Sequence, residues 1–196
     1  AYLVKGNSRI MGFFRTAFYM PVVMSAVVVG MIWTNLLDSA GLVNSVLKAL
    51  KIISKPVPFL TDRWGVLFSS MFVTIWLGLG YYMVIYLTAL ANIDESLYEA
   101  ASLDGAGPVR QFIYVTMPGV RSTMMLIMML STIAAFRVFN EIYVLTNGSA
   151  GPGGMDMTMS MLIKREGTGI QARTGYASAI SLVVLVTVGV MPLVQQ

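Results

Sequence analysis

Side chains able to do chemistry on a substrate are scarce in this sequence of 196 residues. It contains no histidine and no cysteine, which removes thiol nucleophiles, most zinc ligands and the usual general base at neutral pH. The densest group of ionisable side chains is acidic and comprises Asp94, Glu95, Glu99 and Asp104. Without histidine or cysteine beside them, these four carboxylates are interpreted as part of a contact surface rather than of a catalytic site.

The elements that position these acids belong to an unusually apolar chain. Hydrophobic residues make up 57% of the sequence and charged residues 11%, whereas a typical soluble domain carries about 25% charged residues. This deficit predicts that most of the surface faces lipid rather than water. The net charge of +4 is scattered between apolar blocks, which is typical of membrane flanks and does not indicate nucleic-acid binding.

Four stretches without an ionisable residue are predicted to be membrane-spanning helices: Thr16–Leu37, Trp64–Ile93, Ser122–Phe136 and Thr174–Gln196. The first, with 22 residues, would rise about 33 Å as a helix, enough for a hydrocarbon core of about 30 Å. The third holds only 15 residues and is expected to take apolar residues from its flanks. The predicted fold class is an all-α, polytopic transmembrane helix bundle.

The segments between these stretches carry simpler patterns. Between the first two, Gly41–Lys51 predicts a short amphipathic helix lying in the membrane interface, which Pro56 and Pro58 are expected to break. Between the last two, the run Asn147–Gly154 predicts a turn and loop. The basic residues give no orientation, because an N-terminal tail placed inside leaves five of them inside and eight outside, against the positive-inside rule.

Segment 92–118, which holds the four acids, predicts two short helices. Ile93, Leu97, Ala100 and Ala101 recur at the spacing of one helical face, and adjacent alanines keep that face flat, so that another surface can approach closely. We therefore expect a helix here that presents acids and a flat apolar strip between two membrane spans.

The residues after Asp104 predict where this helix stops and the next begins. Gly105 or Gly107 can adopt the positive φ of a helix C-terminus, and Pro108 suits the first turn of a second helix over Val109–Met117. Pro118-Gly119 then marks the junction with the next span. The result is a helix-turn-helix elbow. A segment buried in lipid does not need such a shape, whereas a contact with a protein partner does.

The amino-acid sequence of this elbow resembles that of a known family. Glu99-Ala100-Ala101, Gly105 six residues after the glutamate, and Val115-x-Met117-Pro118 match the EAA motif of binding-protein-dependent ABC importer permeases, in the form usual in sugar permeases. The resemblance implies a permease domain over residues 1–196, cut at the N-terminus and also at the C-terminus, that covers the last four helices of a six-helix core. Met117 in place of leucine and the loop after Thr146 depart from the family pattern.

The resemblance also implies a mechanism, in which 92–118 is a cytoplasmic coupling loop seated on an ATPase. Glu99 would supply the charged contact, Ala100 and Ala101 the close-packing surface, and Gly105 the turn, with Asp104 and Pro118 completing the motif. The implied partners are two ATP-binding subunits, a second permease subunit, an extracytoplasmic substrate-binding protein and the lipid bilayer. ATP and Mg²⁺ would be bound by the partners, because the sequence contains no Gly-x-x-x-x-Gly-Lys-Ser/Thr motif; no cofactor is expected in this chain.

Several residues admit more than one interpretation. Ser96 to Glu99 also fits a capping box, in which Glu99 would be structural, and Pro21 inside the first span predicts a kink. Arg137, Asn140 and Glu141 suit interfacial anchoring as well as a functional site. A substrate path, or alternatively an aromatic belt and helix packing, is assigned to Trp76, Tyr81, Tyr82, Tyr86 and Asn140.

The leading hypothesis for function is an ABC importer permease for a carbohydrate or polyol-type solute. An ABC importer for another solute is the nearest alternative. An ion-coupled secondary transporter would call for carboxylates near the bilayer midplane, and all nine acids lie outside the charge-free stretches. A membrane enzyme would need a cluster of histidine, cysteine or paired acids.

Overall fold

The computed structural model describes residues 9–169 and 172–194, and these residues form helices and loops without a strand. This confirms the predicted all-α class. The α-helices, in chain order, are α1 (Arg9–Tyr19), α2 (Ala26–Leu37), α3 (Leu42–Ala49), α4 (Arg63–Ala91), α5 (Glu95–Leu103), α6 (Pro108–Gln111), α7 (Met117–Gly119), α8 (Arg121–Phe136), α9 (Asn140–Leu145), α10 (Met159–Gly167) and α11 (Thr174–Val194).

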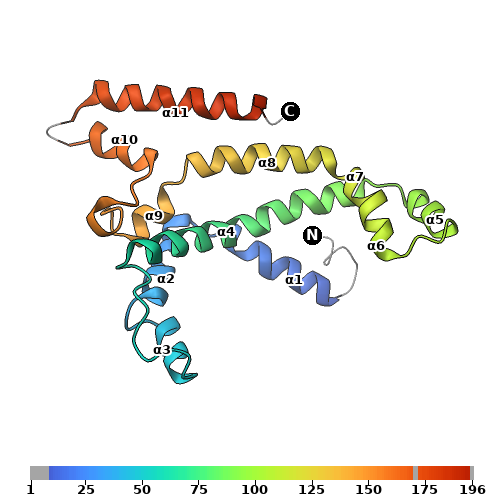
Figure 1. Ribbon diagram of the computed structural model, residues 1–196, viewed down its shortest axis with the longest axis horizontal. Helices are drawn as coiled ribbons and strands as arrows, with labels where there is room; N and C mark the ends of the chain where they lie inside the picture. Colours follow the sequence, from blue (N-terminus) through green and yellow to red (C-terminus); the bar gives the residue numbers. More distant parts are fainter. Residues whose placement is uncertain (1–8, 170–171, 195–196) are drawn as a thin grey trace.

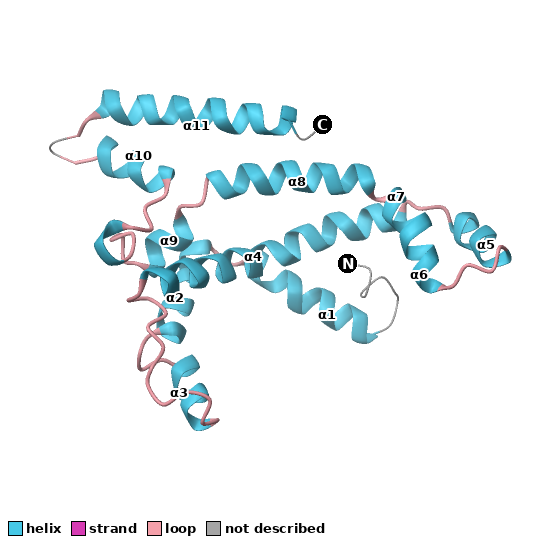
Figure 2. Ribbon diagram, in the orientation of Figure 1, coloured by secondary structure: helices cyan, strands magenta, loops and turns pink. Residues whose placement is uncertain are grey.

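The longest helix, α4, lies in the middle of the molecule, and α1, α8 and α11 run along it (Figure 1). α8 packs beside α4, and α11 packs beside α8 (Figure 2). α5 and α6 lie at one end of α4, whereas α3, α9 and α10 lie at the other end. The elbow and the loop after α9 are therefore at opposite ends of the bundle.

The second predicted span is confirmed as α4, 29 residues long. Its first turn is fixed by Asp62, whose carboxylate accepts hydrogen bonds from the backbone N–H groups of Trp64 and Gly65 at 3.1 and 3.3 Å. A carboxylate in this position satisfies N–H groups that have no partner inside the helix. The boundary thus follows from a local rule that the sequence carries.

The first predicted span, Thr16–Leu37, is not one continuous helix: the irregularity falls at Pro21 as expected, but it is a break and not a kink. α1 ends at Tyr19, a 3-10 helix occupies Met20–Val23, and α2 starts at Ala26. Pro21 has no N–H to continue an α-helix, and at this break the chain passes very close to α4. A Cβ atom added to Gly80 would overlap the carbonyl oxygen of Phe18.

The third and fourth apolar stretches form α8 and α11. Helix Pro108–Gly119 leads into α8 through a bend of 64°, and α11 begins at Thr174 as predicted, while Gln196 lies outside the described residues. By length and composition, two stretches of the described chain can cross a membrane, Ala26–Ala49 and Arg63–Ala91, and three can if the bent pair counts as one. α11 is apolar but shorter within the described range.

Between α2 and α4, the predicted amphipathic helix is present as α3. It ends at Ala49, followed by Lys51 at a φ of 56°, so this turn ends the helix before Pro56 is reached, contrary to expectation. Asn44, 1% exposed, holds the loop between α3 and α4 in place at Val57. Its amide donates to the carbonyl of Val57 at 3.1 Å and accepts from the N–H of Val57 at 2.8 Å.

The buried apolar residues gather in separate clusters instead of one central core. Where α2, α4 and α9 meet, the cluster is Val29, Val73 and Leu145. At the base of the elbow it is Leu90, Ile93 and Val120. A third, around α9 and α10, comprises Ile142, Ala150 and Met161. Large apolar side chains elsewhere face outward, among them Val23 at 76% exposure, which fits a chain whose surroundings are lipid.

Candidate functional site: the elbow between α4 and α8

The first helix of the elbow, α5, is capped by Asp94. The carboxylate of Asp94 accepts a hydrogen bond from the backbone N–H of Ser96 at 2.9 Å. That bond, with a further one from the Ser96 side chain, holds the pKa of Asp94 below its usual value. Ser96 is therefore inside the helix and Glu99 lies beyond its first turn. The predicted capping box from Ser96 to Glu99 is wrong, because the chain offers an acidic cap two residues earlier.

The face that α5 turns outward matches the predicted one only in part: Leu97, 53% exposed, and Ala100 face outward as expected. Ile93 precedes the helix and is buried, and Ala101 is partly buried. The exposed side of α5 carries Glu99, Ala100 and Leu103, at i, i+1 and i+4, which we call the elbow surface. Leu103 is 90% exposed, and sequence reasoning missed it. Its signal was an apolar residue directly before the turn, where the helix has no further turn to cover it.

The turn after α5 confirms the predicted role of Gly105. Gly105 has a φ of 74°, and its N–H donates to the carbonyl of Ser102 at 3.0 Å. The N–H of Ala106 donates to the carbonyl of Ala101 at 2.9 Å, so the pair of bonds forms a Schellman motif with glycine at its left-handed position. Asp104 is the residue at which the helix ends. A Cβ added to Gly105 would meet nothing within 4 Å, so the backbone angle, and not space, requires glycine here.

The second arm of the elbow is longer and less regular than predicted. It runs from Pro108, the first residue of α6 as expected, to Gly119, and its middle part Phe112–Thr116 is a π-helix. Pro118 lies inside α7, where its ring would collide with the carbonyl one turn earlier in a regular α-helix. The wider π-turn gives the chain room to include it. A Cβ added to Gly119 would lie 2.8 Å from the Cδ1 atom of Ile93, so glycine permits the close approach of α7 to Ile93 in the connection between α4 and α5.

Hydrogen bonds hold the two arms together on their inner side. The hydroxyl of Tyr98 lies 2.9 Å from that of Thr116. The side-chain amide of Gln111 donates to the hydroxyl of Ser102 at 2.9 Å and to the carbonyl of Ala106 at 3.1 Å. The elbow is therefore a fixed body with its acid Glu99 on the outside.

The five residues assigned to a substrate path lie in several places. Trp76 packs edge-on against Trp33, with 5.5 Å between ring centroids, in the cluster of α2, α4 and α9. Tyr86 packs against the cluster at the base of the elbow. Tyr81 and Tyr82 contact each other edge-on, and Asn140 is the first residue of α9, shortly after the C-terminal end of α8.

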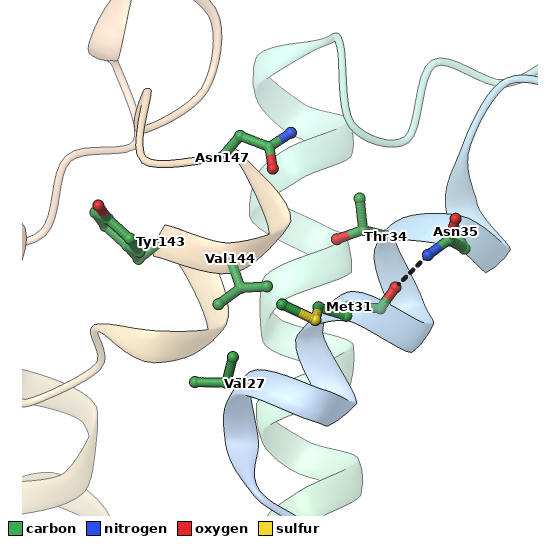
Figure 3. Close-up of a pocket in the computed structure, with 7 residues that line it drawn as sticks. All are labelled: Val27, Met31, Thr34, Asn35, Tyr143, Val144 and Asn147. Carbon is green, nitrogen blue, oxygen red and sulfur yellow. Dashed lines mark hydrogen bonds between the residues drawn. The ribbon is translucent and has the colours of Figure 1, made fainter.

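A hollow of about 490 Å³ lies between α2 and α9 (Figure 3). Val27 and Met31 point toward Val144 across it, and Thr34 and Asn147 lie at its polar end. Its lining consists of Val27, Met31, Thr34, Asn35, Tyr143, Val144 and Asn147. None of the five predicted path residues lines it. Sequence reasoning missed this hollow because its two sides are more than a hundred positions apart in the chain.

The family described as "Binding-protein-dependent transport system inner membrane component" matches residues 1–196. Among curated relatives, the lactose transport system permease protein LacF of Rhizobium radiobacter is 33% identical over 195 residues, which cover 100% of this chain and 65% of the relative. The chain thus spans less than two thirds of the length of this relative.

Two solved structures share the fold. One is a bacterial ABC transporter involved in the import of the acidic polysaccharide alginate, with a TM-score of 0.79 and 22% identity over 98% of this chain and 67% of that one. The other is a bacterial alginate ABC transporter in complex with an alginate pentasaccharide-bound periplasmic protein, with a TM-score of 0.74 and 24% identity over 98% of this chain and 65% of that one. The family match extends over the full sequence, and the helices are apolar enough to cross a membrane. The chain belongs to the binding-protein-dependent transport system inner membrane components, the permeases of ABC importers.

Proposed function

We propose that this chain is the membrane-spanning part of an ATP-driven importer for a carbohydrate or polyol-type solute. Elbow 92–118 docks in the cytoplasm onto an ATP-binding subunit, and closure of two such subunits on ATP moves the elbow and changes access from outside to inside. A second permease subunit and an extracytoplasmic binding protein complete the assembly. The observation that carries the proposal is the elbow surface, an acid and two small or apolar residues turned away from the bundle.

Two further observations support the choice of partners. The elbow lies at the end of α4 opposite to the loop after α9 (Figure 1), so a cytoplasmic elbow leaves the other end free for a protein on the outside. A relative named for lactose transport and a neighbour named for alginate import, captured with its periplasmic protein, favour a sugar solute delivered by such a protein. Nucleotide binding is assigned to the partner.

The test is charge reversal at Glu99. We expect Glu99→Lys to lower ATP-driven uptake by at least about tenfold, because a cation replaces the one acid of the elbow surface at a protein contact. Uptake of radiolabelled lactose, other oligosaccharides and polyols is measured in vesicles that hold the full transporter. The amount of inserted permease is measured in the same vesicles and should not change.

Two control variants separate charge from general damage. Glu99→Gln keeps the shape of the side chain and should lose less uptake than Glu99→Lys. Arg9→Glu reverses a charge on an exposed residue at the start of α1, outside the elbow and away from the end assigned to the binding protein, and should transport normally. Wild-type uptake by Glu99→Lys would contradict the proposed docking of the elbow.

A further inference from the structure

The inner side of the elbow contains a pair of hydroxyls that join its two arms. Tyr98 is in α5, Thr116 ends the π-helix, and their oxygens are 2.9 Å apart although 18 positions separate them in the sequence. Thr116 is 1% exposed. We call this pair the elbow joint. A buried hydroxyl that loses its partner costs free energy, so the surrounding structure favours the closed joint.

The elbow joint belongs to a closed ring of hydrogen bonds. The hydroxyl of Thr116 also lies 3.5 Å from the carbonyl oxygen of Gln111, so it donates there and accepts from Tyr98. The side-chain amide of Gln111 donates to the hydroxyl of Ser102, which donates to the carbonyl of Tyr98 at 2.8 Å. The ring therefore returns to Tyr98 and ties α5 to the second arm at more than one point.

The elbow joint also lies between the elbow surface and the spans. Tyr98 is adjacent to Glu99 in the sequence but turns inward, where its ring packs against Leu90, Ile93 and Val120. Thr116 is followed directly by α7, which bends into α8. π-turns inside helices are often placed at functional sites. A displacement of α5 thus reaches the base of α8 through Tyr98, whose ring contacts the cluster that includes Val120 and whose hydroxyl contacts Thr116.

We infer that Tyr98 and Thr116 are positioning residues that make the elbow move as one rigid body with the base of α8. The inference rests on the proposed coupling role of the elbow and adds to it the contact that transmits the movement. With the elbow joint closed, a shift of the elbow surface is passed to α8. With the joint open, α5 can follow the ATP-binding subunit while α8 stays in place.

The experiment uses a reporter at the far end of the molecule in the full transporter with its ATP-binding partner. The sequence contains no cysteine, so Thr34→Cys, in the hollow between α2 and α9, introduces a single thiol into this chain. Its rate of reaction with a membrane-impermeant maleimide is measured by mass spectrometry of its peptide, with and without MgATP and vanadate. In the parent with Thr34→Cys alone we expect ATP to change this rate by about tenfold, as for a typical coupling between sites.

Three variants on this parent then test the elbow joint. Tyr98→Phe and Thr116→Val each remove one hydroxyl and should reduce the ATP effect by about fivefold, the value of one hydrogen bond. The two losses should not multiply in the double variant, because both break the same contact. Thr116→Ser, which keeps the hydroxyl, should retain the full ATP effect. ATP hydrolysis and copurification of the ATP-binding subunit should stay at parent levels.

Each contrary result has one meaning. A full ATP effect in Tyr98→Phe, multiplying losses in the double variant, or a loss in Thr116→Ser would overturn the elbow joint as the transmitting contact. Loss of the ATP-binding subunit from Tyr98→Phe would also overturn it, since the hydroxyl would then serve assembly. A parent whose thiol does not respond to ATP would contradict the proposed coupling itself.

Discussion

Individual side chains set where the elbow begins and which way it faces. Asp94 caps α5 through the N–H of Ser96, so the outward direction of Glu99 depends on a residue five positions earlier. Tyr98, next to Glu99, turns inward to Thr116. Neighbouring residues thus point in opposite directions, Glu99 to the outer side of α5 and Tyr98 to the inner side.

The cap of α5 should depend on pH. The pKa of Asp94 is lowered by hydrogen bonds from the Ser96 N–H and side chain, so its ionised form stabilises α5. This stability is complete above the ordinary pKa of an aspartate and is lost as the pH falls through the lower pKa of the folded protein. Hydrogen exchange of the first turn of α5, corrected for the intrinsic rate at each pH, should show protection that decreases in acid.

Substitutions at Asp94 check this assignment. Asp94→Asn retains an oxygen acceptor, and its protection should not vary with pH. Asp94→Ala removes the acceptor, and exchange in the first turn should rise by about fivefold at neutral pH. Equal exchange in Asp94→Ala and the wild type would show that another group caps the helix.

At the scale of elements, contacts between backbones decide how the helices pack. α4 passes the break after α1 so closely that Gly80 has no room for a side chain. Small residues at helix contacts are a general device in membranes, where burial of apolar side chains gives no driving force between helices. The break at Met20–Val23 and Gly80 therefore form one packing unit.

Gly80→Val should disrupt this unit. The added side chain would overlap the Phe18 carbonyl and should lower stability by about 1–3 kcal/mol, as overpacking does. The measurement is the midpoint of thermal unfolding in detergent, followed by tryptophan fluorescence. The matched control is Gly12→Ala in α1, where a Cβ meets nothing within 4 Å and which should be neutral or slightly stabilising. A Gly80→Val protein as stable as the control would show that α1 does not pack on α4 in this way.

The sequence predicts those elements that depend on local rules. The end of α5 before Gly105 and the start of α6 at Pro108 follow from backbone conformation alone, and α4 follows from a long apolar stretch. The break in Thr16–Leu37 escapes prediction because a charge-free interval gives the length of the apolar segment and not the continuity of its helix. The π-helix is not predictable from the sequence, because the Pro118 ring disturbs the turn before it, where the apolar pattern is regular.

The candidate site is predictable to the same degree. Glu99 and the turn were found from local pattern, whereas Leu103 depends on which face of α5 the spans cover. The elbow joint needs two residues 18 positions apart, and only the folded elbow brings them together.

At the scale of the whole molecule, the absence of a phosphate-binding motif from the sequence leads to a further prediction. We expect the purified chain, without its ATP-binding partner, to bind no nucleotide. Equilibrium dialysis with labelled ATP and Mg²⁺ measures this directly, and the assembled transporter is the positive control. Saturable binding by the chain alone would contradict the assignment of ATP to the partner.

The position of the elbow at one end of α4 has a mechanical consequence. A helix of 29 residues rises about 43 Å, so a small tilt at the elbow end is amplified at the other end. If α4 tilts by about 5° around that end, its far end travels about 4 Å by this length alone. Under the proposed docking of the elbow, a small tilt at that end would become, at the hollow between α2 and α9, a displacement comparable to the width of a water molecule.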